Sequence, residues 1–230
     1  MKAGWLLFLL VLAQGSQAAA SQRDGRSPSL FPAGCFANYE RGAPIYTLSI
    51  DHPEAPARFR YPASCDVGNW NKQPNRWAGA LNLQASVDNG LCYSFEEWVD
   101  RDPFHVTKFR LFLSLHATVR DLRPLMAARS GQDGSFTLGP QTNVGLRPLT
   151  FAAGEDDYDR WVRKDIDGRI VELLQCRKAG AVASPDCDHH LIEGSARLSL
   201  AYKRKHRGRA DVIRGYAQKL LSCSRDVTPD

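Results

Sequence analysis

Six cysteines constrain this chain of 230 residues more than any other feature, because all of them lie beyond an apolar N-terminal segment. Lys2 gives that segment a positive start, residues 5–13 are uncharged and apolar, and residues 16–20 supply small residues for a signal peptidase. We therefore expect residues 1–20 to be a signal peptide and the rest to fold where disulfides form. The chain has no Asn-x-Ser/Thr glycosylation site, which favours a bacterial periplasm, with secretion as the alternative.

The cysteines can pair in several ways, and spacing favours one pair. Cys176 and Cys187 bracket a short loop between two strand-like segments, and closing it stabilises the fold by about 3 kcal/mol. The others are paired only by elimination, as Cys65 with Cys92 and Cys35 with Cys223. Because no two cysteines lie close together with zinc-ligand spacing, we expect no metal site.

Alternation of apolar and polar residues dominates the chain after residues 21–34, a polar stretch that we expect to be a disordered lead-in. The alternation predicts hairpins and strands at residues 46–61, residues 81–95 with a turn at Asn89-Gly90, residues 108–118, and around turns at Asp167-Gly168 and Glu193-Gly194. Residues 130–145 are expected to be mostly loop because glycines and Pro140 interrupt them.

Two helices are predicted. Residues 121–129 form a short one with Pro124 in its first turn. Residues 210–223 form an amphipathic one, with an apolar stripe of Val212, Ile213, Tyr216, Ala217, Leu220 and Leu221. Many hairpins with one packed helix predict a single α+β domain over residues 35–230, an antiparallel sheet packed against a C-terminal amphipathic helix and cross-linked by disulfides. No later apolar run is long enough for stable membrane anchoring.

Groups that could perform chemistry do not match known catalytic motifs. In the sequence Asp188-His189-His190, a strand would send the two imidazoles to opposite faces, so we expect one packed and one exposed histidine and no shared metal. Residues 155–167 are acidic but lack a calcium-loop pattern, which favours a solvated loop that could recognise a basic partner. We therefore predict no catalytic residue and no cofactor.

A basic run at residues 203–209 is the clearest charge feature of a chain whose formal net charge is +5. No aromatic residues interleave with it and nucleic acid is scarce in the expected compartment, so nucleic acid is not an expected partner. Two interpretations stay open: a solvated connection between strand and helix, or a surface that binds a protein partner. The second interpretation uses Arg204, Lys205, Arg207 and Arg209.

The order of features over residues 151–221 adds a family resemblance. An acidic turn leads to Trp161, a strand ends at Cys176, a loop leads to residues 187–190, and a strand ends at residues 202–204 before the amphipathic helix. This arrangement resembles periplasmic immunity proteins that neutralise lipase effectors delivered by type VI secretion. The resemblance implies a protein that binds a toxin tightly and occludes its active cleft.

Three functions follow as hypotheses. The first is a periplasmic immunity protein that binds a type VI secretion toxin and performs no catalysis. The second is a secreted hydrolase with an unrecognised site that uses His105, His116, His189 or His190. The third is a periplasmic carrier of a small molecule or lipid, which needs a sizeable apolar cavity between sheet and helix.

Overall fold

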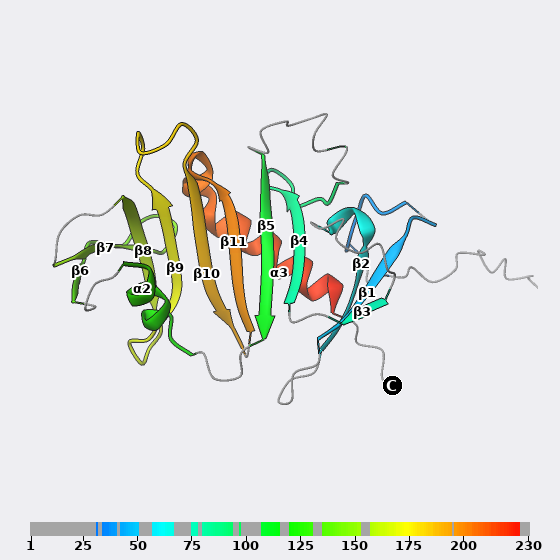
Figure 1. Cartoon of the computed structure of the whole chain (residues 1–230), viewed down its shortest axis with the longest axis horizontal. Coiled ribbons are helices and arrows are strands. Elements are labelled where there is room, and N and C mark those ends of the chain that lie inside the picture. Colours follow the sequence, from blue (N-terminus) through cyan, green and yellow to red (C-terminus); the bar gives the residue numbers. More distant parts are fainter. Residues whose placement is uncertain are drawn as a thin grey trace, which may run out of the picture. The chain divides into compact units, whose positions relative to one another are not determined.

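The structure is a computed structural model (Figure 1). It describes residues 31, 34–40, 42–50, 57–66, 75–77, 80–93, 97, 107–115, 120–130, 135–152, 157–194 and 196–225. The predicted signal peptide and most of the predicted lead-in lie outside these residues, so both stay predictions. From Phe31 onward the contacts group the chain into one compact unit.

An eight-stranded sheet, antiparallel at every neighbouring pair, forms the centre of this unit. Its spatial order is β4-β5-β11-β10-β9-β8-β7-β6. The strands are β4 (Ala80–Ser86), β5 (Lys108–Leu115), β6 (Phe136–Leu138), β7 (Arg147–Phe151), β8 (Tyr158–Lys164), β9 (Ile170–Arg177), β10 (Asp186–Glu193) and β11 (Ala196–Lys203). The hairpins predicted around Asp167-Gly168 and Glu193-Gly194 are confirmed as β8–β9 and β10–β11.

A second, three-stranded sheet has the order β2-β1-β3. It consists of β1 (Ile45–Ile50), β2 (Ala57–Pro62) and β3 (Asn75–Trp77), and a single 3₁₀ turn, η1 (Ala63–Cys65), follows β2. β1 and β2 pair antiparallel, which confirms the first predicted hairpin, whereas β1 and β3 pair parallel.

Helices cover the two faces of the large sheet, as Figure 1 shows with α2 (Arg123–Ser130) in front and α3 (Ala210–Ser224) behind. A 3₁₀ helix, η2 (Arg204–Arg209), connects β11 to α3. Ile213 and Ala217 of α3 pack in one buried cluster with Leu198 and Leu200. α2 contributes to a second cluster of Leu122, Met126, Leu149, Phe151, Val162, Ile170 and Leu173. The predicted α+β fold with a packed C-terminal helix is therefore confirmed.

Three disulfides cross-link the unit: Cys35–Cys223, Cys65–Cys92 and Cys176–Cys187. These are the pairings that spacing and elimination favoured. Cys176 and Cys187 are register partners on β9 and β10. The first bond fastens the N-terminal segment to the end of α3.

Two predictions about individual elements were wrong. The strand expected after Asn89-Gly90 does not form at residues 91–93, and β4 instead pairs with β5. Val212 is exposed, so it does not belong to the buried stripe of α3. The stretch predicted to be mostly loop also contains the short strand β6, Phe136–Leu138. Among the described residues, no helix has the length and apolarity needed to span a membrane.

Candidate functional site

The basic run, which the sequence leaves open as a solvated connection or as a partner surface, folds mostly into η2 at the end of β11. Its four named cations fall into two classes. The guanidinium of Arg204 binds the carboxylate of Asp159 on β8 and donates to the carbonyl of Arg177 at 2.7 Å. Arg209 binds the carboxylate of Asp88 at 2.7 Å. Arg204 and Arg209 therefore hold η2 against the rest of the protein.

Lys205 and Arg207 form the other class, because both side chains are exposed. The guanidinium carbon of Arg207 lies 4.8 Å from the centroid of the Trp161 ring, a cation–π geometry that favours this direction of the side chain. Within the described part of the chain, neither residue has a carboxylate partner. Their charges are therefore accessible from solvent.

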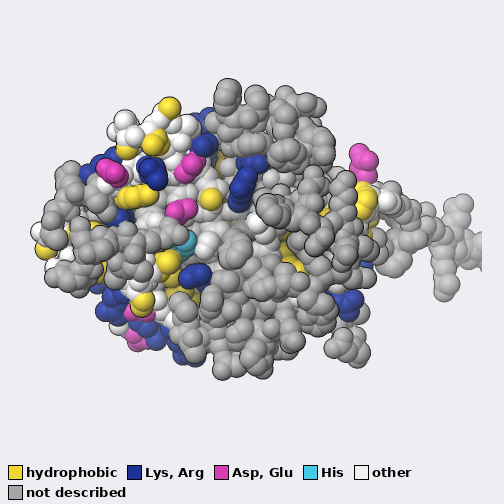
Figure 2. Space-filling view, in the orientation of Figure 1, with side chains coloured by type: hydrophobic (Ala, Val, Ile, Leu, Met, Phe, Trp, Pro, Cys, Tyr) yellow, Lys and Arg dark blue, Asp and Glu magenta, His cyan; other side chains and the backbone are white. Residues whose placement is uncertain are grey.

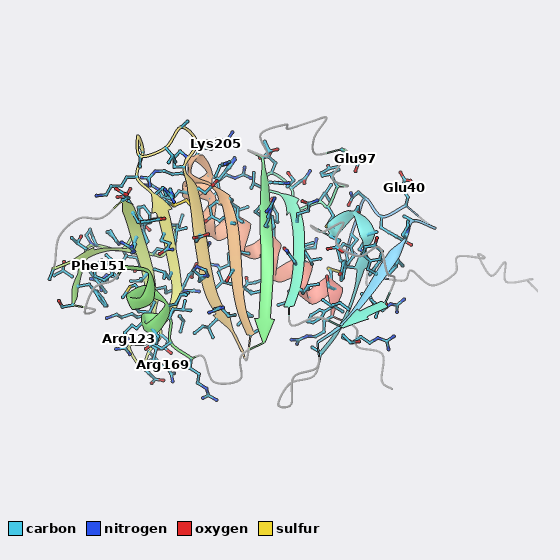
Figure 3. All side chains as sticks on the ribbon, viewed as in Figure 1. Glu40, Glu97, Arg123, Phe151, Arg169 and Lys205 are labelled. Atoms are coloured by element: carbon cyan, nitrogen blue, oxygen red, sulfur yellow. A yellow bond between two sulfur atoms is a disulfide. The ribbon has the colours of Figure 1, made fainter. Side chains whose placement is uncertain are left out.

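A groove of about 520 Å³ lies between η2 and the loop that joins β9 to β10. It is lined by Ala183, Ser184, Pro185, Lys203, Arg204, Lys205, Arg207 and Gly208. Figure 3 shows Lys205 at this end of the sheet, beside the β9–β10 loop, whereas Arg123 and Arg169 lie at the opposite end. We call these eight residues the basic groove.

Three fixed contacts define the walls of the basic groove. The Cys176–Cys187 disulfide closes the base of the loop. The N–H of Arg204 donates to the carbonyl of Pro185 at 2.9 Å. The ammonium of Lys203 lies 2.8 Å from a carboxylate oxygen of Asp186. The groove is thus formed by residues that the fold already holds in place.

A second cluster of ionisable groups is buried beneath α3. Glu172 of β9 is fully buried, and its carboxylate accepts two hydrogen bonds from Arg214 of α3, at 2.8 and 2.9 Å. Arg163 of β8 lies 2.6 Å from the same carboxylate, and His189 Nε2 lies 2.7 Å from it. The Tyr202 hydroxyl lies 3.1 Å from His189 Nδ1. One carboxylate therefore joins three strands of the sheet to α3.

The electrostatics of this cluster favour a structural role. Burial acts to raise the pKa of Glu172, but hydrogen bonding and charge from His189, with the charges of Arg163 and Arg214, lower it overall. Burial, reinforced by the charge of Glu172, raises the pKa of the Tyr202 hydroxyl. The contacts Tyr202–His189–Glu172 follow the nucleophile–base–acid order of a catalytic triad. The Tyr202 hydroxyl, however, is hard to deprotonate, and all three side chains are buried.

The histidine prediction was half right. His189 and His190 do point to opposite faces of β10, since His189 contacts Glu172 whereas His190 contacts Ser199 at 2.8 Å. The prediction that one of the two histidines is exposed was wrong, because both side chains are buried. No group of metal-ligating residues occurs among the residues that the structure describes. His105 and His116 lie outside those residues.

The acidic stretch at residues 155–167 is not one solvated loop. Asp159 lies on β8 and binds Arg204. Asp165 and Asp167 lie in the β8–β9 turn and bind Arg169, with an Asp165–Arg169 distance of 2.8 Å. These carboxylates are therefore divided between the two ends of β8, where each is paired within the chain. Figure 2 likewise shows acidic and basic side chains intermixed on the described part of one face.

A carrier of a small molecule or lipid needs a sizeable apolar cavity between sheet and helix. A cavity beside α3, lined among others by Phe36, Leu91, Tyr216 and Leu220, has a volume of about 70 Å³. Sites for small ligands occupy roughly 300–1,000 Å³. This cavity is therefore too small for a lipid or a drug-sized ligand.

Sequence reasoning missed the buried cluster around Glu172. The signal was present, because Glu172 interrupts the apolar run of residues 170–174. A charged residue at a buried strand position requires a partner. Its partners Arg163 and Arg214 come from β8 and α3, and local spacing does not reveal such pairings.

Comparisons with known proteins identify the fold. No family model matches the chain, and no curated protein matches it significantly. The chain is similar in structure to the immunity protein Smlt3025 of a type IV secretion system of Stenotrophomonas maltophilia, with a TM-score of 0.56 and 15% sequence identity. The match covers 79% of this chain and 95% of that protein. A match to the iron-regulated outer membrane lipoprotein FrpD of Neisseria meningitidis has a TM-score of 0.33 and 10% identity, and covers 77% of this chain and 92% of that one. The chain thus shares its overall fold with Smlt3025.

Proposed function

We propose that this chain is an exported immunity protein that binds a protein toxin and blocks its action. The observation that carries the proposal is the fold likeness to Smlt3025, which extends over nearly all of that immunity protein. It agrees with the independent resemblance of residues 151–221 to immunity proteins. The two lines differ in the secretion system, type IV for the structure and type VI for the sequence resemblance.

The physical character of the chain supports inhibition by contact. Three disulfides and a wide antiparallel sheet give a stiff body, which lowers the entropy lost on binding. The ionisable side chains around Glu172 are engaged in contacts with one another. An exposed basic groove remains available for an oppositely charged partner.

The finer form of the proposal names compartment and toxin. Disulfides persist in oxidising compartments, which supports the periplasm as the place of action. The toxin that we propose is a lipase effector of a type VI system, and binding would occlude its active cleft. The contact surface in this proposal includes Lys205 and Arg207.

A toxin gene next to the gene of this chain is the natural starting point for the test. The two products are expressed together, with the toxin exported to the periplasm, and growth and co-purification are measured. We expect growth to be restored and a stable complex to be recovered. Continued killing without any complex would contradict the proposal. Type IV and type VI toxins of other activities are tested in the same way to settle the effector class.

The hydrolase alternative is tested on the same preparation. Ester and glycoside substrates are incubated with the purified chain and with a His189→Ala variant. Turnover by the wild type that the variant lacks would replace the immunity proposal with the enzyme hypothesis. We expect no turnover by either protein.

A further inference from the structure

We infer that the basic groove binds an acidic segment of the toxin, and that Lys205 and Arg207 contact its carboxylates while Arg204 and Arg209 keep the groove in shape. This inference rests on the proposed function and assigns a partner chemistry to one surface. It also separates four neighbouring cations into two with a binding role and two with a structural role.

The first argument is charge. Of the described residues that line the groove, four are cationic and none is acidic. Asp186 neutralises Lys203 and Asp159 neutralises Arg204. The charges of Lys205 and Arg207 are left without a carboxylate among the described residues. An acidic occupant would supply the missing partners.

The second argument is that Arg207 is held in a binding orientation before the partner arrives. Its guanidinium lies over the Trp161 ring of β8, which restricts its rotamers. A planar guanidinium binds a carboxylate through two parallel hydrogen bonds, and an ordered one loses less entropy in doing so. Arginine is accordingly one of the residue types that dominate the energy of protein interfaces.

The third argument concerns the shape of the occupant. A volume of about 520 Å³ between a loop and η2 accommodates a short peptide segment. A membrane presents a nearly flat surface that would not enter such a groove. Ala183 and Pro185 add apolar surface to the lining of the groove, which suits a protein loop with mixed side chains. We therefore assign an acidic protein segment as the occupant.

The test compares charge-reversal variants of the full mature chain. A Lys205→Glu/Arg207→Glu double variant removes both exposed cations, and Lys219→Glu reverses an exposed cation on α3 that does not line the groove. Urea unfolding first establishes that both variants fold. Titration calorimetry then measures the affinity for the toxin. We expect the double variant to lose about 30-fold or more and the control to lose less than about threefold.

Two further variants separate binding from positioning. Arg207→Lys retains the charge but not the fork, so it should lie between the wild type and the double variant. Arg209→Gln removes the contact with Asp88 that fastens η2, so it should lower the urea midpoint and should weaken toxin binding by less than the double variant does. A double variant that binds the toxin as well as the wild type does would overturn the inference and leave the proposed function intact.

A probe that needs no toxin keeps the inference testable if the proposed function fails. An Asp-Ser repeat peptide and its neutral Asn-Ser counterpart are titrated into the wild type and the double variant. Binding of the acidic peptide alone, lost in the double variant, supports the inference even without toxin binding. If neither peptide binds and vesicles of phosphatidylglycerol do, in a manner that depends on Lys205 and Arg207, the groove recognises a membrane and the inference is wrong.

Discussion

Glu172 is the residue on which the interior of this protein depends most. Its carboxylate receives Arg214 from α3, Arg163 from β8 and His189 from β10. A buried charge is tolerated only when it is paired and hydrogen-bonded, and this one is satisfied from three directions. The cluster therefore fixes where α3 lies on the sheet.

Replacing Glu172 with Gln should destabilise the protein strongly. The variant keeps the shape but leaves Arg163 and Arg214 without their carboxylate. Because both arginines are partly exposed, we expect a loss of about 2–3 kcal/mol, which is below the cost of breaking a fully buried pair. Urea unfolding of the variant measures this loss. Glu193→Gln is the matched control, because Glu193 is exposed and contacts only Gln218 among the described residues. A loss below about 1 kcal/mol for Glu172→Gln would contradict this account.

The same residue predicts a pH dependence. Because the folded-state pKa of Glu172 lies below its ordinary value, its ionised form stabilises the fold above that ordinary value, and the stabilisation disappears as pH falls through the folded-state pKa. The difference in unfolding free energy between wild type and Glu172→Gln should therefore be largest near neutrality and shrink in acid. Urea unfolding at a series of pH values measures it. A difference that grows on acidification would have the wrong sign.

At the scale of elements, the sheet shows what local sequence patterns predict and what they miss. Hairpins β8–β9 and β10–β11 could be predicted because Gly168 and Gly194, both at positive φ, mark their turns. Gly90 also has a positive φ of 71°, but the described residues 91–93 that follow it do not form the expected strand. There Cys92 bonds to Cys65 and β5 takes the place beside β4. Long-range competition, which no local pattern contains, decided the pairing.

The basic groove shows the same limit. The cations at residues 203–209 were evident in the sequence, but their roles were not. Arg204 contacts Asp159, which is 45 residues away, and Arg209 contacts Asp88, which is 121 residues away. These non-local pairs decide which cations form internal ion pairs and which stay exposed. The sequence therefore revealed the cluster of cations but not which of them are paired within the chain.

Gly90 in the turn after β4 and Gly168 in the β8–β9 turn allow a matched comparison of two glycine substitutions. A Cβ at Gly90 would lie 2.8 Å from ring atoms of Tyr216, whereas a Cβ at Gly168 would meet nothing within 4 Å. Both glycines have positive φ, which costs another residue about 1–2 kcal/mol. The Tyr216 hydroxyl donates to the carbonyl of Asp88 at 3.0 Å, so the ring is not free to move.

Gly90→Ala should therefore destabilise the protein by about 1–3 kcal/mol more than Gly168→Ala does, since overpacking adds to backbone strain. Urea unfolding of the two variants measures the difference directly. Equal losses would mean that Tyr216 does not press on this turn.

At the scale of the whole molecule, the described residues from Phe31 onward form a disulfide-linked unit that carries an accessible basic groove. The α+β class and the C-terminal helix were predictable because period-two and helical patterns are local. In the proposed function, the chain inhibits a toxin by contact at the basic groove and not by chemistry. Such an inhibitor neutralises toxin in proportion to the number of bound chains, whereas one enzyme molecule converts many substrate molecules.

Stoichiometry is therefore the most direct measurement. Purified toxin is held at a concentration well above the dissociation constant, and its remaining activity is followed as the mature chain is added. We predict a linear decrease that reaches zero at one chain per toxin molecule. Full toxin activity in the presence of excess chain, or inactivation by a small fraction of an equivalent, would contradict inhibition by binding.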